Sequence, residues 1–126
     1  MKFEVYQIQL PEWMYNEINR LGHAKAAESF SIYKAHLDTT MGKWNPVHRA
    51  MYTKVATVQA NSLEDVFRIG NIGPYEGGDE SIEQHTPMHS ISVGDLVRDE
   101  DGVWFFCERM GWTIVFVETK IKDFAA

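Results

Sequence analysis

Stretches of β-forming residues stand at the beginning, in the middle and at the end of this chain, and most of the helical periodicity lies between the first two stretches. Residues 3–10 and 52–60 are rich in β-branched and aromatic side chains, although their alternation is imperfect. The final third holds several shorter stretches separated by turn residues. This order predicts an α+β fold, with a small, mainly antiparallel sheet and with helices inserted between the first and second strands.

The helical segments follow from apolar spacing and from the residues that stand at their ends. A proline before residues 12–21 and a glycine after them suit the start and the left-handed cap of a helix. Residues 24–37 keep their apolar side chains close to one face, which predicts one helix there. A short helical turn is expected at residues 45–49, and a last helix is expected at residues 63–69, where glycines stop it.

The last third reads as a run of antiparallel strands. Residues 90–93 lead into residues 96–98, and an acidic Asp-Gly turn reverses the chain into residues 103–107. Residues 112–117 are apolar on both faces, which predicts a central strand. Residues 71–86 contain glycines and acids, and we expect a long exposed loop there.

Length and composition are typical of one domain. The chain has 126 residues, of which 44% are hydrophobic, so we expect a single domain with a strand and helices in residues 1–50 and a β-rich part in residues 51–126. Its one cysteine, Cys107, excludes an intramolecular disulfide and a cysteine-based zinc cluster. No apolar run approaches the roughly 18 residues of a membrane span, and no signal-peptide core follows the first residues. A cytoplasmic protein without membrane association is therefore predicted.

The charge of the chain bears on its partners. A net charge of −6 argues against a general binder of nucleic-acid phosphates, because such a protein needs a basic face. One group of acids lies in the loop expected over residues 71–86, and another is formed by Asp99, Glu100 and Asp101. If the two groups are adjacent, they form one negative patch that steers a basic partner, and otherwise both are solvated turns.

One ordered string of residues resembles a known family. The string comprises HSISVGDLV at residues 89–97, Asp101-Gly102, FFC at residues 105–107 and MGW at residues 110–112. It resembles the C-terminal half of YodL-like domains, and the similarity extends over about Tyr52 to Val117. Such small domains occur in bacterial, plasmid and phage proteins, some of them beside or within antirestriction proteins. The resemblance implies a phage or mobile-element setting, and it carries over no catalytic residue.

The turn residues of this string have a structural interpretation of their own. Gly94 permits a positive φ, and the Asp95 carboxylate can accept backbone N–H groups in a tight turn. Asp101 and Gly102 are a strong hairpin signal. We therefore assign all four residues to turns and not to catalysis.

The function that these observations favour is protein binding without catalysis. The chain is predicted to be an accessory protein of a phage or mobile element that binds a host or phage protein, with antirestriction-type antagonism of host defence as one form of that role. Trp44 lies in an irregular stretch, and Tyr75 lies in the acidic loop, so both are candidates for exposed contacts. The predicted binding surface comprises Trp44, Tyr75, Glu76, Asp79, Glu80 and Glu83.

Two alternatives belong to other classes. A small nucleic-acid-associated regulatory module would use a few local basic residues, namely Lys43, His48, Arg49 and Lys54. An enzyme would use Cys107 as a nucleophile or would use His85 and His89, with Asp95 as a further candidate.

No cofactor or metal is predicted. His85 and His89 could share a metal ion with Glu83 or Asp79, but Pro87 disfavours the helix that their spacing needs. The glycine-containing segment at residues 73–78 lacks the following Lys-Ser/Thr of a P-loop.

Overall fold

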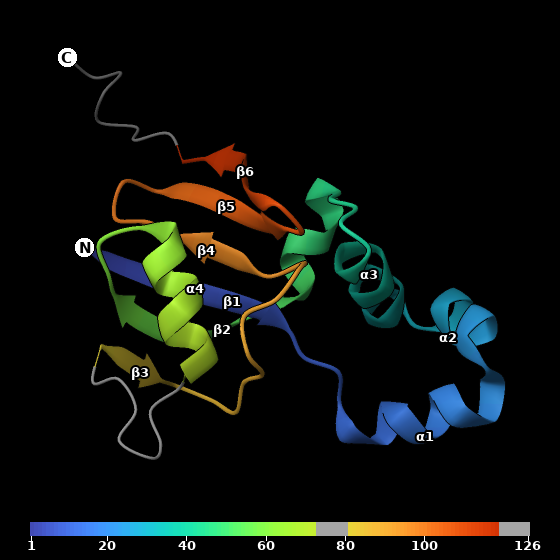
Figure 1. Ribbon diagram of the computed structural model, residues 1–126. Coiled ribbons are helices and arrows are strands. Elements are labelled where there is room, and N and C mark those ends of the chain that lie inside the picture. Colours follow the sequence, from blue (N-terminus) through green and yellow to red (C-terminus); the bar gives the residue numbers. More distant parts are fainter. Residues whose placement is uncertain (73–80, 119–126) are drawn as a thin grey trace.

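A computed structural model describes residues 1–72 and 81–118, and it shows an α+β fold built on one antiparallel sheet (Figure 1). Within these residues the sheet has six strands in the order β3-β2-β1-β4-β5-β6. The strands are β1 (Lys2–Ile8), β2 (Tyr52–Gln59), β3 (Ile82–Gln84), β4 (Leu96–Arg98), β5 (Val103–Glu108) and β6 (Gly111–Val117). The helices are α1 (Glu12–Leu21), α2 (His23–Ser29), α3 (Ser31–Thr40), the 3-10 helix η1 (Pro46–Met51) and α4 (Leu63–Ile72). Four of these helices lie between β1 and β2, which confirms the predicted placement of helices there.

The helices between β1 and β2 pack on one another beside the end of the sheet (Figure 1). Pro11 precedes α1, and Gly22 ends α1 at a φ of +82°. The prediction of one helix over residues 24–37 is wrong, because Phe30 has an extended conformation with φ −125° and ψ 107° and separates α2 from α3. The break lets Ala26 of α2 and Tyr33 of α3 join one apolar cluster with α1.

The sheet carries an apolar cluster on each face. α4 covers one face, where its residues Val66 and Ile69 pack with Val5 and Val97 of the sheet (Figure 1). Leu96, Trp104 and Phe106 form a second cluster with partly buried Trp44 and Tyr52. The neighbouring residues Leu96 and Val97 of β4 thus belong to different clusters, as the alternation of a strand requires.

Three expectations about individual elements are wrong. Residues 90–93 form no strand, because their chain enters the turn that the Asp95 side chain closes. The segment at residues 71–86 is not wholly a loop, since β3 pairs with β2 and buries Ile82. β6 is an edge strand and not a central one, because only β5 pairs with it among the described residues.

None of the helices in the described part of the chain is both long and apolar enough to cross a bilayer.

Candidate functional site

The outer side of β6 is the most apolar edge of the described sheet. The strand reads GWTIVFV, so it contains one hydroxyl and no charged residue or proline. Natural edge strands are commonly protected against further pairing by charges, by proline or by being short. β6 has none of these three protections, because it contains no charged residue and no proline and is seven residues long. Its backbone edge can therefore accept another strand.

The register with β5 shows which way the side chains of β6 point. Trp112 pairs with Cys107 and packs against the cluster beneath α4. Ile114 pairs with Phe105, which pairs in turn with Val97 of that same cluster. Because cross-strand partners share a face, Trp112 and Ile114 both lie on the α4 face. Ile114 is 58% exposed there, beyond the area that α4 covers.

The opposite face of β6 is also apolar. Phe116 pairs with Trp104 and is 39% exposed, and the Arg49 guanidinium stands 4.5 Å from the centre of its ring. The register shifts between the Trp104 and Phe105 pairs, which leaves Val115 as an extra residue in β6. The regular part of the ladder is therefore the first half of the strand, Gly111 to Ile114.

A hollow of about 430 Å³ adjoins this regular half of β6. Phe67 of α4 and Trp112 of β6 supply aromatic walls. Two acids, Glu64 and Glu108, and one base, Arg109, also line it. The α4 face near Trp112 therefore offers an apolar slot with more acidic than basic side chains around it.

Of the predicted binding surface, only Trp44 and Glu83 belong to the described residues. Glu83 lies on β3, and its side chain is 77% exposed, while Tyr75, Glu76, Asp79 and Glu80 lie outside the described residues. Trp44 is partly buried and not fully exposed, and its contact with a partner stays a prediction. Its ring packs against the Leu96 cluster, with its centre 5.5 Å from that of Phe106, because the irregular stretch before η1 folds back onto the sheet.

The acidic turn between β4 and β5 lies apart from Glu83. Glu83 lies on β3, which is an edge strand, and the strands β2 and β1 separate β3 from β4. Asp99 accepts hydrogen bonds from the backbone of Asp101 and Val103, at 2.9 and 3.0 Å. Gly102 has a φ of +80°, so the predicted turn roles of Asp101 and Gly102 are confirmed, with Asp99 as the side chain that closes the turn.

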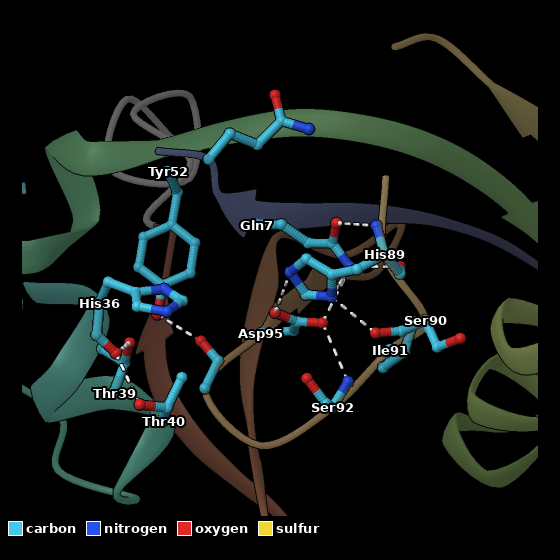
Figure 2. A network of polar contacts seen from close by, with 12 residues as sticks. Gln7, His36, Thr39, Thr40, Tyr52, His89, Ser90, Ile91, Ser92 and Asp95 are labelled. Atoms are coloured by element: carbon cyan, nitrogen blue, oxygen red, sulfur yellow. Dashed lines mark hydrogen bonds and ion pairs between the residues drawn. The ribbon is translucent and has the colours of Figure 1, made fainter. Parts of the chain in front are cut away.

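Gly94 and Asp95 form the predicted turn before β4, and the Asp95 carboxylate also anchors a larger polar network. Its side chain is only 5% exposed, and Oδ2 accepts hydrogen bonds from the Ser92 backbone N–H and from Gln7 Nε2, both at 3.0 Å (Figure 2). Gln7 Nε2 also donates to the His89 carbonyl at 2.9 Å, and Gln7 Oε1 accepts from His89 N–H at 3.2 Å. The network ties β1 to the segment that precedes β4.

The ionisation of Asp95 is strongly affected by this setting. Burial raises the pKa of its carboxyl to about 6, although the charge of His89 and the hydrogen bonds from Ser92 and Gln7 act to lower it. The sequence suggested the turn role of Asp95. It did not suggest Gln7, whose one signal was a long polar side chain between Tyr6 and Ile8 in an apolar strand.

The hydrogen bonds of His89 define its tautomer. Nδ1 lies 2.7 Å from the Ser90 carbonyl, which can only accept, so Nδ1 carries a proton. The 3.2 Å approach of Gln7 Nε2 to Nδ1 is then a contact between two donors. In the neutral ring the lone pair lies on Nε2, and Nε2 faces Asp95 Oδ1 at 3.9 Å (Figure 2).

The residues of the enzymatic alternative lie in different surroundings. Cys107 is buried, and this burial, reinforced by the charges of Asp95 and Glu108, raises the pKa of its thiol to about 11. The thiol is therefore protonated at neutral pH and is not prepared as a nucleophile. His85 Nε2 instead lies 2.8 Å from Thr57 Oγ1. Within residues 1–72 and 81–118, no group of three potential metal ligands is found.

The basic residues of the nucleic-acid alternative are mostly engaged with other side chains. Lys54 Nζ lies 2.6 Å from a Glu4 carboxylate oxygen, and His48 Nε2 lies 3.6 Å from an Asp38 oxygen. The Arg49 guanidinium lies between the rings of Trp104 and Phe116.

Comparison of the chain with protein-family models, with curated proteins and with solved structures finds no match.

Proposed function

We propose that this protein is a non-enzymatic accessory protein that binds another protein by adding a strand of that partner to β6. The observation that carries the proposal is the apolar edge of β6, where Ile114 and Val117 are 58% and 56% exposed. Strand addition uses the free backbone groups of an edge for affinity and neighbouring side-chain pockets for specificity. The hollow beside Trp112 is such a pocket.

The two edges of the sheet differ in a way that supports this choice. β3 has three residues, and two of them, Glu83 and Gln84, are exposed and polar. Such a short, polar strand is an edge protected against pairing. β6 is longer and apolar on both faces. Among the described strands, β6 is therefore the edge to which a partner strand can pair favourably.

The end of β6 is held in place before any partner arrives. Glu118 follows the strand and accepts hydrogen bonds from Arg98 at 2.7 and 2.8 Å and from Trp104 Nε1 at 2.8 Å. These bonds lower the pKa of the Glu118 carboxyl to about 2. An edge that is already ordered loses less conformational entropy when it binds.

The occupant that we propose is a strand of a different protein, and not a second copy of this chain. Each copy carries a net charge of −6, so two copies repel each other. Glu64 and Glu108 beside the slot favour a partner strand with an apolar side chain facing Trp112 and a basic residue near it. The resemblance to YodL-like domains supports a host or phage protein as the partner, and antagonism of a host defence as the result.

The test compares two lysine substitutions at exposed apolar residues. Ile114→Lys places a charge on the proposed interface, and Val47→Lys places one on η1, where Val47 is 70% exposed. Tagged wild type and both variants are used to capture proteins from host cells with nuclease present. Hydrogen exchange of the β6 amides is then measured in the purified complex.

The proposal expects that wild type and Val47→Lys capture one protein in stoichiometric amount and that Ile114→Lys does not capture it. In the complex, this protein should slow hydrogen exchange of the amides at residues 111–114. Capture that is unaffected by Ile114→Lys contradicts it. A second copy as occupant would appear as a dimer in light scattering that Ile114→Lys dissociates. If residues 119–126 of the same chain occupied the edge, the β6 amides would be protected from hydrogen exchange without a partner, and a chain ending at Glu118 would lose this protection. Either result overturns the proposed partner.

A further inference from the structure

A second hollow, of about 230 Å³, lies between the end of α3 and the turn that precedes β4. His36, Thr39 and Thr40 line it from α3, and His89, Gly94 and Asp95 line it from the other side (Figure 2). Its lining contains neither lysine nor arginine. This site shares no strand edge with β6, although Ser92 and Val93 line both this hollow and the one beside Trp112.

The polar groups around this hollow are mostly acceptors. Asp95 Oδ2 is engaged by Ser92 and Gln7, but no hydrogen bond among the described residues ends on Oδ1. The Thr40 hydroxyl donates to the His36 carbonyl at 2.9 Å, so its oxygen retains lone pairs for accepting. The C-terminal end of a helix carries a partial negative charge, and α3 ends at this hollow.

The gap between His89 and Asp95 has the geometry of an unfilled donor position. With Nδ1 protonated, neutral His89 presents a lone pair at Nε2, and ionised Asp95 presents Oδ1 only 3.9 Å away. This separation is too long for a direct hydrogen bond. A group with two N–H donors can lie within about 3 Å of both acceptors, which is the usual N–H···O distance. The pair therefore favours a donor that also carries positive charge.

We propose that this hollow binds a primary ammonium group, with two of its N–H donors directed at Asp95 Oδ1 and His89 Nε2. Charge-assisted hydrogen bonds to a buried carboxylate are stronger than neutral ones. The ammonium belongs either to a small free amine or to a lysine side chain of a bound polypeptide. Both sources offer the same chemistry, and the experiment separates them.

Protons compete with this ligand for the same acceptors. The titratable groups near Asp95 come from four elements or segments: His89 beside the turn, His36 of α3, Tyr52 of β2 and Cys107 of β5. Burial and the nearby His89 lower the pKa of His36, so its ring is neutral at neutral pH. Burial keeps the Tyr52 hydroxyl and the Cys107 thiol protonated there too. Binding should therefore be tighter above the pKa of about 6 of the Asp95 carboxyl.

The experiment titrates the full chain with butylammonium at about pH 8 and follows the Asp95 carboxyl carbon and the Thr40 and Gly94 amides by NMR. We expect saturable shifts at these groups and at least about tenfold weaker binding at about pH 5. N-acetyl-lysine amide forms the second arm. If it binds while butylammonium does not, the source is a polypeptide lysine, and the reverse result indicates a free amine.

Matched controls separate donor recognition from simple filling of the hollow. 1-Butanol lacks the charge, and tetramethylammonium lacks N–H donors, so neither should shift the Asp95 carbon. Asp95→Asn should weaken butylammonium binding at least about tenfold, because it removes the charge and directs an amide N–H₂ at His89. Thr40→Val, at an exposed residue that lines the same hollow, is the control variant and should weaken it far less. Equal shifts with either control ligand, or no saturable shift with either amine, overturn the proposal.

Discussion

Asp95 combines a structural role with an unfavourable ionisation. Its Oδ2 closes the turn at Ser92 and holds Gln7 of β1, so removing the side chain would release two segments at once. Its burial disfavours the charged form that most carboxyls adopt at neutral pH, and the pKa of about 6 reflects this cost. An asparagine side chain could close the same turn without the cost of burying a charge. The presence of an aspartate at this position therefore agrees with a ligand that binds the charged carboxylate.

The pH dependence of stability should differ between wild type and Asp95→Asn. The Asp95 carboxyl has an ordinary pKa of 3.8, and in the folded protein the pKa is about 6, so the folded state binds this proton more tightly. Its contribution to stability is fully present below about pH 4 and is lost as the pH rises through about 6. Relative to wild type, Asp95→Asn should therefore gain up to about 3 kcal/mol in unfolding free energy between about pH 4 and pH 7.5.

Urea unfolding followed by tryptophan fluorescence at both pH values gives this difference. Glu4 and Glu118, whose pKa values are lowered, titrate in both proteins and cancel in the comparison. A difference between the two proteins that does not change with pH would contradict the raised pKa of Asp95.

At the scale of elements, periodicity predicted those strands and helices whose burial is one-sided. α1 is an example, because Met14 and Ile18 bury one stripe of it. Periodicity could not place β6, since a strand that is apolar on both faces can be central or can be an edge that awaits a partner. It could not show the break at Phe30 either, because α2 and α3 keep their apolar residues facing the same cluster.

The candidate site was predictable only where its residues are close in sequence. The turn at Gly94 and Asp95 depends on neighbouring residues, and local rules identify it. The partners Gln7 and Asp95 are 88 positions apart, and their contact depends on the pairing of β1 with β4. No pattern along the chain gives that register, so the polar network could not be predicted from the sequence.

The turn glycines of the sheet offer a test of how α3 is joined to β4. Gly94 has a φ of +99°, and a Cβ there would lie 2.8 Å from the Thr39 carbonyl carbon and oxygen. Gly111 has a φ of +111°, but a Cβ there would meet nothing within 4 Å. Gly111→Ala should therefore cost about 1 kcal/mol of unfolding free energy, from backbone strain alone.

Gly94→Ala should cost about 3 kcal/mol, because the clash with α3 backbone adds to the same strain. Urea denaturation of both variants gives the comparison, and amide shifts at Thr39 should move only in Gly94→Ala. Equal costs would mean that α3 does not pack against this turn as described.

At the scale of the whole molecule, the described residues form three apolar clusters that are connected to one another in different ways. Two of them lie on the faces of the sheet and share its strands, so loosening one disturbs the backbone that supports the other. The third lies among α1, α2 and α3, where Met14, Ile18, Ala26 and Tyr33 are buried. It is joined to the rest mainly through β1 and η1. Proteins open in such cooperative units, and the unit with fewer external contacts opens first.

Cys107 can report which unit opens, because its thiol is buried in β5 and reacts only when the sheet opens. Ile18→Ala should remove about 2–4 kcal/mol from the helical cluster and speed hydrogen exchange across α1 and α2. It should leave the rate of Cys107 modification by a thiol reagent almost unchanged. Val97→Ala, a substitution in the α4-covered cluster, should instead speed both processes, because opening the sheet also releases β1 from the helices. If Ile18→Ala accelerates Cys107 modification as strongly as it accelerates helix exchange, the molecule opens as one unit, and the partition into clusters has no thermodynamic meaning.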